Sequence, residues 1–180
     1  AKLAPAESKG CFAPWSQVLM GNGSQVPIAS VRASDIVMAW DSKTATLTTA
    51  GVVKVDAFPA SELMEMRLWT TASLERQLTS GVDAGIQGGS IILTADHPVF
   101  SVRSKGPVSL NPKATLESYK LMVDQMRERE LLRHHLGHDV EASVHNWSGS
   151  VLPPFVMTLR LDKHHWFFVE GILVHNKGGG

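Results

Sequence analysis

The sequence has little of the features that mark several large protein classes. It has one cysteine in 180 residues, and its 17 basic residues balance its 17 acidic residues. One cysteine cannot form an internal disulfide and no secretory leader is visible, so we expect an intracellular location. Zero net charge argues against nucleic acid or an anionic membrane as the partner. The longest apolar run, residues 166–174, contains Glu170 and is too short to span a bilayer.

Short alternating segments separated by Gly, Pro, Asp and Ser dominate the chain and predict strands. The expected strands cover residues 16–20, 26–28, 36–40, 47–55, 63–69, 90–93, 99–102, 151–161 and 166–174. Residues 70–89 have little pattern and are expected to form a loop. Many short strands with turn residues between them indicate one compact all-β domain.

One segment has a longer apolar period. Across residues 111–136 apolar side chains recur at helical spacing. Asn111 suits the N-cap, Pro112 the first turn and Gly137 the stop. We therefore expect one helix around residues 112–136, inserted into the β domain. Its solvated face is expected to carry the charged side chains of Glu128, Arg129 and Glu130.

The patterned part of the chain begins at Cys11 and ends at Asn176. Residues 1–10 and 177–180 have no comparable pattern, so we interpret them as short flanks of a domain spanning residues 11–176. A lone cysteine is usually a small buried apolar residue. Its position at the start of the patterned region instead favours a nucleophile that acts on the preceding peptide bond.

The residues at these boundaries suit reactions on the backbone itself. The thiol of Cys11 can attack the carbonyl of Gly10 and convert that amide into a thioester. The side-chain amide of Asn176 can attack its own carbonyl, close a succinimide and release Lys177 with a free amine. His175 can polarise that carbonyl or protonate the leaving amine. We call the Gly10–Cys11 bond the N-junction and the Asn176–Lys177 bond the C-junction.

Both reactions pass through a tetrahedral oxyanion, which needs hydrogen-bond donors and a group that handles protons. Thr94 and His97 lie three residues apart at the end of an expected strand, so both can reach one peptide bond. His97 is expected to donate to the nitrogen that leaves Gly10, and Thr94 to hold the carbonyl or the strained peptide. The pattern alone is weak, because such pairs are more often structural.

Three blocks of the sequence resemble those of inteins and other Hint domains. They are Cys11-Phe12-Ala13 with Val26-Pro27-Ile28 and Asp35-Ile36-Val37, then Leu93-Thr94-Ala95-Asp96-His97-Pro98, and finally residues 165–176 with their terminal His-Asn. The blocks stand in the family's order and cover nearly the whole chain. The closing block is the most distinctive.

The resemblance implies a horseshoe-like all-β fold in which both ends of the domain meet in one cleft. It also implies that Cys11 is the nucleophile and that Asn176 is the residue that cyclises. The residues implied to assist them are Thr94, His97, His165 and His175. The role of His165 comes from the resemblance alone.

Two departures from the family pattern bear on the product. Splicing inteins have Cys, Ser or Thr after the final Asn, whereas this chain has Lys177, a protonated amine at neutral pH and a poor acceptor. We therefore expect cleavage at one or both junctions rather than ligation of the flanks. Thr158 occupies a position where many inteins have an Asp, so tuning of the thiol must come from elsewhere or be weaker.

Several alternatives stay open. His134 and His138 have the i, i+4 spacing of two metal ligands on a helix, but no further ligand completes a site, and a solvated helix end is the simpler interpretation. Two other functions also fit the sequence: an inactive Hint domain that serves as a binding module, and a Cys-His hydrolase that acts on other proteins. No cofactor is indicated. The expected partners of a monomer are its own flanks in cis and an external thiol or water.

Overall fold

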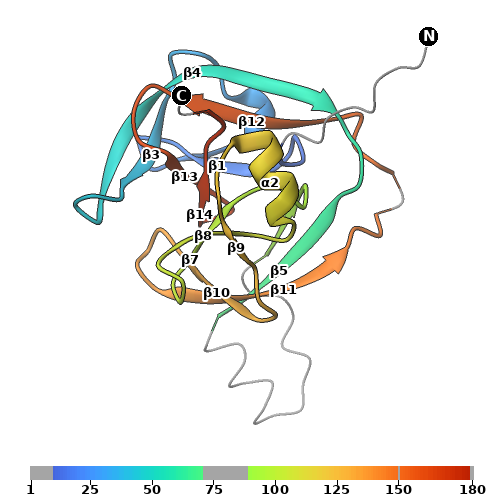
Figure 1. Cartoon of the computed structure of the whole chain (residues 1–180). Helices are drawn as coiled ribbons and strands as arrows, with labels where there is room; N and C mark the ends of the chain where they lie inside the picture. The colour runs from blue at the N-terminus through green and yellow to red at the C-terminus, as the bar shows by residue number, and fades with distance from the viewer. Residues whose placement is uncertain (1–9, 71–88, 150, 179–180) are drawn as a thin grey trace.

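The computed structural model describes residues 10–70, 89–149 and 151–178. Within these ranges, fourteen strands form one curled sheet (Figure 1). In chain order the strands are β1 Gln17–Leu19, β2 Gln25–Pro27, β3 Ile36–Asp41, β4 Thr46–Pro59, β5 Met64–Thr70, β6 Ser90–Leu93, β7 Val99–Ser101, β8 Gly106–Ser109, β9 Asp124–Gln125, β10 Glu130–Arg133, β11 Asp139–Asn146, β12 Phe155–Leu161, β13 Trp166–Val169 and β14 Ile172–His175. The expectation of an all-β domain is confirmed.

The strand order brings distant parts of the chain together. The path through the sheet is β12-β4-β3-β13-β14-β7-β10-β11-β5-β6. The long strand β4 pairs with β3 through its first part and with β12 through its second part, so it belongs to both arms of the curl. Because β13 and β14 lie in the middle of the path, the C-terminal hairpin is enclosed by strands from the rest of the chain.

This hairpin, β13–β14, fills the centre of the molecule. All residues of its two strands except His175 are buried. Successive side chains point to opposite faces, so Phe167 and Val169 join the main core while Trp166 and Phe168 pack in a second cluster. Burial on both faces explains why this segment is continuously apolar in the sequence.

The segment expected to be one strand, residues 166–174, contains a tight turn. Glu170 and Gly171 both have positive φ, 49° and 78°. Two such residues match the twist of the strands that they join, so the chain reverses there. His175 and Asn176 consequently return to the interior of the curl instead of continuing outward.

The predicted helix over residues 112–136 is wrong in length. Helix α2 spans only Pro112–Tyr119, with the Asn111 side chain capping the Ala114 amide as expected. Lys120 adopts a left-handed conformation with φ 55°, which ends the helix long before Gly137. The following residues form β9 and β10 because strand pairing satisfies their backbone and buries alternate side chains.

The predicted solvated face of that helix is also partly wrong. Glu130 lies in β10 and is fully buried, where it accepts hydrogen bonds from the Ser101 hydroxyl at 2.7 Å and the Arg127 amide at 2.9 Å. Glu128 and Arg129 are exposed. Residues 71–88 of the expected loop lie outside the described part of the chain.

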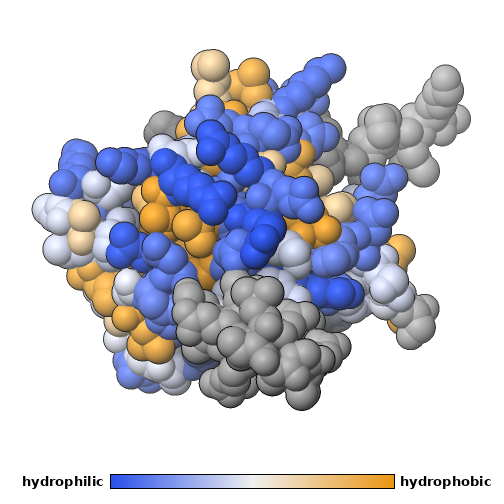
Figure 2. All heavy atoms as spheres, turned by 90° about the horizontal axis from the view of Figure 1, so that it is seen from below, coloured by the Kyte–Doolittle hydropathy of each residue, from blue (hydrophilic) through white to orange (hydrophobic). Residues whose placement is uncertain are grey.

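In the view of Figure 2, hydrophilic residues are intermixed with separate apolar patches on the surface of the described residues. No helix within the described ranges is long and apolar enough to cross a membrane.

Candidate functional site

The N-junction is held between two strands that come from opposite ends of the sheet. Phe12 forms bridges to Leu93 at the end of β6 and to Met157 in β12. Gly10 and Cys11 are buried as a result. The Gly10–Cys11 peptide bond is therefore shielded from bulk water, and hydrogen bonds to it are strong in this buried environment.

Thr94 contacts the nitrogen side of the N-junction. Its hydroxyl oxygen accepts a hydrogen bond of 2.9 Å from the Cys11 amide, the nitrogen that would leave Gly10. Its own backbone amide donates to the Cys11 carbonyl at 3.0 Å. The loop after β6 thus fixes Cys11 from both sides. From the sequence we expect His97, rather than Thr94, to contact this nitrogen.

Tyr119 contacts the carbonyl side of the N-junction. The phenol, on the last residue of α2, donates to the Gly10 oxygen at 2.9 Å. Burial raises the pKa of Tyr119 well above its usual value of 10, and Cys11 and Asp96 raise it further. Tyr119 is therefore a neutral donor that points at the oxygen on which negative charge would develop.

His97 lies between the two junctions. Its Nδ1 is 3.1 Å from the Tyr119 hydroxyl and its Nε2 is 3.0 Å from the carbonyl oxygen of His175. The ring packs on Phe12 with centroids 4.1 Å apart. Burial lowers the pKa of His97 from 6.5 to about 3, and the charges of His175 and Lys177 act in the same direction, although two backbone carbonyls partly oppose the shift. The imidazole is neutral near pH 7.

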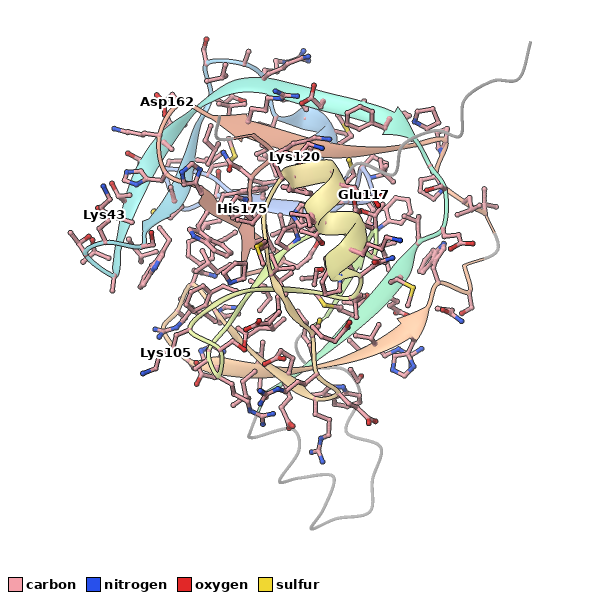
Figure 3. All side chains as sticks on the ribbon, viewed as in Figure 1. Lys43, Lys105, Glu117, Lys120, Asp162 and His175 are labelled. Atoms are coloured by element: carbon pink, nitrogen blue, oxygen red, sulfur yellow. The ribbon has the colours of Figure 1, made fainter. Side chains whose placement is uncertain are left out.

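The C-junction is bounded by His175 on its N-terminal side. Nδ1 of His175 lies 2.6 Å from the Asn176 carbonyl oxygen, the oxygen that would carry charge during cyclisation. A carbonyl only accepts, so Nδ1 carries the proton of this hydrogen bond. Burial lowers the pKa of His175 to about 4, so the donor is a neutral imidazole. Figure 3 shows His175 inside the curl, beside helix α2.

Asn176 is fully buried and held by the main chain. Its backbone amide donates to the His165 carbonyl at 2.7 Å. In the amide orientation that satisfies both groups, Nδ2 donates to the same carbonyl at 3.3 Å and Oδ1 accepts from the Leu161 amide at 3.2 Å. The side chain is therefore ordered in a resting position.

His165 meets the site through its backbone more than through its ring. Its carbonyl is the acceptor for Asn176, whereas its exposed imidazole stacks parallel to that of His175, with centroids 5.6 Å apart. The ring also lowers the pKa of His175. Its ring lies next to His175 at the C-junction, and the assisting role that the resemblance implies stays a prediction.

The two positions that depart from the family pattern both lie near Tyr119. Lys177 is 7% exposed, and its Nζ lies 4.9 Å from the ring centroid of Phe58 and 5.9 Å from that of Tyr119. Thr158, in β12, is fully buried and close to the phenol. Tyr119 therefore contacts the Gly10 carbonyl of one junction and the Lys177 side chain of the other.

Tyr119 is the site residue that sequence reasoning missed. It is the only tyrosine of the chain, and its spacing marked it as an apolar helix position. Its partner Gly10 is 109 residues away, so no local pattern connects them. The one available signal was a hydroxyl-bearing side chain at an otherwise apolar position of the expected helix.

The histidine cluster lies elsewhere, at the β10–β11 turn rather than at a helix end. The His134 ring stacks on that of His138 with centroids 4.4 Å apart, and His135 lies 4.5 Å from His134. Across the described ranges, no group of three or more His, Cys, Asp or Glu side chains is arranged to hold a metal ion.

Comparisons with known proteins address the fold. No family model matches the sequence, and no curated protein matches it significantly. Among solved structures, the bacterial intein-like domain from Clostridium thermocellum is 19% identical with a TM-score of 0.65, covering 93% of this chain and 99% of that one.

Two DnaB inteins are similar to the same degree. The DnaB intein from Synechocystis sp. PCC 6803 is 17% identical with a TM-score of 0.64, covering 94% of this chain and all of that chain. The Ssp DnaB mini-intein variant M86 is 17% identical with a TM-score of 0.62, covering 96% and 97%. The chain therefore has the fold of inteins and of the bacterial intein-like domain, the Hint fold.

Proposed function

We propose that this domain cleaves its own backbone, once and in cis, at the N-junction and the C-junction. The observation that carries the proposal is the shared position of His97. One ring nitrogen contacts Tyr119, which holds the Gly10 carbonyl, and the other contacts the carbonyl of His175. The fold shared with inteins supports the same conclusion.

At the N-junction, the sulfur of Cys11 attacks the carbonyl carbon of Gly10. The carbon–sulfur bond forms, the carbon–nitrogen bond breaks, and the thiol proton ends on the amino group of Cys11. The hydroxyl of Thr94, 2.9 Å from that nitrogen, can pass the proton. An external thiol or water then takes the acyl group from the thioester.

At the C-junction, Nδ2 of Asn176 attacks the carbonyl carbon of the same residue. The Nδ2–carbon bond closes a succinimide, the carbon–nitrogen bond to Lys177 breaks, and the proton that Nδ2 loses ends on the free α-amine of Lys177. The hydrogen bond of 2.6 Å from His175 stabilises the oxyanion. Nδ2 must first leave the His165 carbonyl, so we expect this step to be slow in the resting arrangement.

We expect cleavage to prevail over splicing. Ligation needs a nucleophile that accepts the acyl group from Cys11 and later returns it to the new amine. Lys177 has neither a thiol nor a hydroxyl, and an amide formed on its side chain would not rearrange as an ester does. Lys177→Cys restores a thiol at this position and should produce ligated flanks.

Intact-mass spectrometry of the full chain tests the proposal. With added thiol, we expect products that lack residues 1–10 or 177–180. Cys11→Ala should abolish only the first loss and Asn176→Ala only the second. His145→Ala, an exposed histidine remote from the site, is the matched control. Wild-type rates in both variants would refute the mechanism, and a precursor that stays intact would favour a binding module.

A further inference from the structure

The carbonyl oxygens next to the two junctions are connected by a chain of three contacts. The Tyr119 hydroxyl lies 2.9 Å from the Gly10 oxygen and 3.1 Å from Nδ1 of His97. Nε2 of the same ring lies 3.0 Å from the His175 oxygen. In all three contacts the two heavy atoms are within hydrogen-bond distance.

The three contacts share too few protons for all of them to be hydrogen bonds at once. Carbonyl oxygens only accept, so every proton must come from Tyr119 or His97. The phenol supplies one and a neutral imidazole supplies one, which leaves two protons for three contacts. A third proton would require an imidazolium, which burial opposes, as do the positive charge of Lys177 and the neighbouring His175.

Two arrangements of these protons satisfy consecutive contacts and are favoured, because hydrogen bonds in series polarise and strengthen each other. In the first, Tyr119 donates to Gly10 and Nδ1 of His97 donates to Tyr119, so the lone pair of Nε2 faces the His175 oxygen. In the second, Tyr119 donates to Nδ1 and Nε2 donates to His175, so Gly10 receives no hydrogen bond from Tyr119. Each of these arrangements leaves two acceptors facing each other at one end. An arrangement in which Tyr119 donates to Gly10 and Nε2 donates to His175 separates the two hydrogen bonds and loses this strengthening.

We propose that Tyr119 is a catalytic residue of the N-junction, and that Tyr119 and His97 serve the carbonyls of Gly10 and His175 alternately. This inference rests on the proposed function. Tyr119 touches the reacting oxygen of Gly10, whereas His97 acts on the C-junction as a positioning residue, through the peptide that precedes Asn176.

The order of the two cleavages follows from this alternation. Negative charge on the Gly10 oxygen favours the first arrangement, because hydrogen bonds to an oxyanion are stronger than those to a carbonyl. When residues 1–10 leave, that acceptor is gone and the second arrangement has no competitor. His97 then holds the His175 carbonyl, and the C-junction reacts faster.

Tyr119→Phe tests the proposal when the two junctions are measured separately. In an Asn176→Ala chain, we expect thiol-induced cleavage at the N-junction to slow by about 100-fold, the usual effect of losing an oxyanion donor. In a Cys11→Ala chain, the same substitution should accelerate cleavage at the C-junction by at least about twofold, because His97 no longer divides its proton between two positions.

Opposite changes at the two junctions distinguish this role from a structural one. If Tyr119 only anchored α2, Tyr119→Phe would slow the N-junction without accelerating the C-junction, and that result, or no change at either junction, would overturn the inference. Leu116→Ala, an exposed position on the same helix, should leave both rates unchanged.

A spectroscopic measurement keeps the inference separate from the proposed function. In a full-length Cys11→Ala/Asn176→Ala chain, imidazole ¹⁵N shifts should report both neutral tautomers of His97. Adding Tyr119→Phe should leave only the Nε2–H form. An unchanged tautomer ratio would overturn the alternation even if both junctions cleave as proposed. Failure of the wild-type chain to cleave would instead refute the proposed function.

Discussion

The two junctions are surrounded by groups of different origin. At the N-junction the contacts come from the side chains of Thr94 and Tyr119, which are 83 and 109 residues from their partners. At the C-junction they come from the preceding residue His175 and from the backbone of His165. The N-junction therefore depends on the docking of a distant helix, whereas the C-junction depends on a hairpin in the core. Loss of the groups at one junction should therefore not slow the reaction at the other.

Gly10→Ala should impair the reaction at the N-junction, with the largest expected effect. A methyl group at Gly10 would overlap the ring of Tyr119, with the Cζ atom 2.7 Å away. Displacing the phenol by about 1 Å should slow thioester formation by about 100-fold, measured as thiol-induced cleavage. Gly106→Ala has no close neighbour and should behave as wild type. An unchanged rate in Gly10→Ala would contradict the role of this contact.

His175→Leu should impair the reaction at the C-junction alone. The variant keeps a side chain of similar size but removes the donor to Asn176, so release of residues 177–180 should slow by about 100-fold. Cleavage at the N-junction is the internal control in the same mass spectra. His165→Leu should have a smaller effect, because that ring touches His175 rather than the reacting atoms. Equal effects at both junctions would argue against their independence.

Ser118→Ala should have a smaller effect, limited to the rate of cleavage at the N-junction. The Ser118 hydroxyl donates to the buried carboxylate of Asp96 at 2.7 Å and ties α2 to the loop that carries His97. Losing one such hydrogen bond should slow the N-junction by about fivefold or less and leave the C-junction unchanged, in the same assay. Glu117→Ala, an exposed neighbour, is the control. A decrease at the C-junction would show that α2 supports both sites.

The smallest expected effect is a loss of stability in acid, and it tests His97, the residue that contacts both junctions. The folded state keeps His97 neutral down to about pH 3, whereas the unfolded state protonates it near pH 6.5. Below pH 6.5 the unfolded state therefore binds more protons, so the free energy of unfolding decreases as the pH is lowered. The contribution of His97 to this decrease is up to about 2 kcal/mol between pH 6.5 and pH 5.

Urea unfolding of a Cys11→Ala/Asn176→Ala chain measures this loss, and His97→Asn should flatten it. Part of the dependence should survive, because the pKa of His175 is also lowered, to about 4. A pH profile that His97→Asn leaves unchanged would show that this imidazole is not kept neutral by the fold.

The fold was predictable where local pattern and tertiary environment agree. Short alternating segments such as β3 and β5 formed strands close to their expected bounds. The error over residues 112–136 has a physical cause, since apolar residues spaced by three or four also suit short strands joined by turns. Lys120 in a left-handed conformation, which ends α2, gives no warning in the sequence.

The candidate site was predictable only in part for a related reason. The closing His-Asn and the pair Thr94 and His97 stand in recognisable blocks, so their positions were expected from the resemblance. Tyr119 belongs to no block, and its meaning depends on packing that places α2 over Gly10.

The cation–aromatic contact of Lys177 with Tyr119 has one more consequence. The same aromatic ring touches the residue before one junction and the residue after the other, through its hydroxyl and its face. Gly10 and Lys177 therefore lie close together in the fold. A host protein could thus accommodate the domain within a single surface loop, with little displacement of the segments on either side.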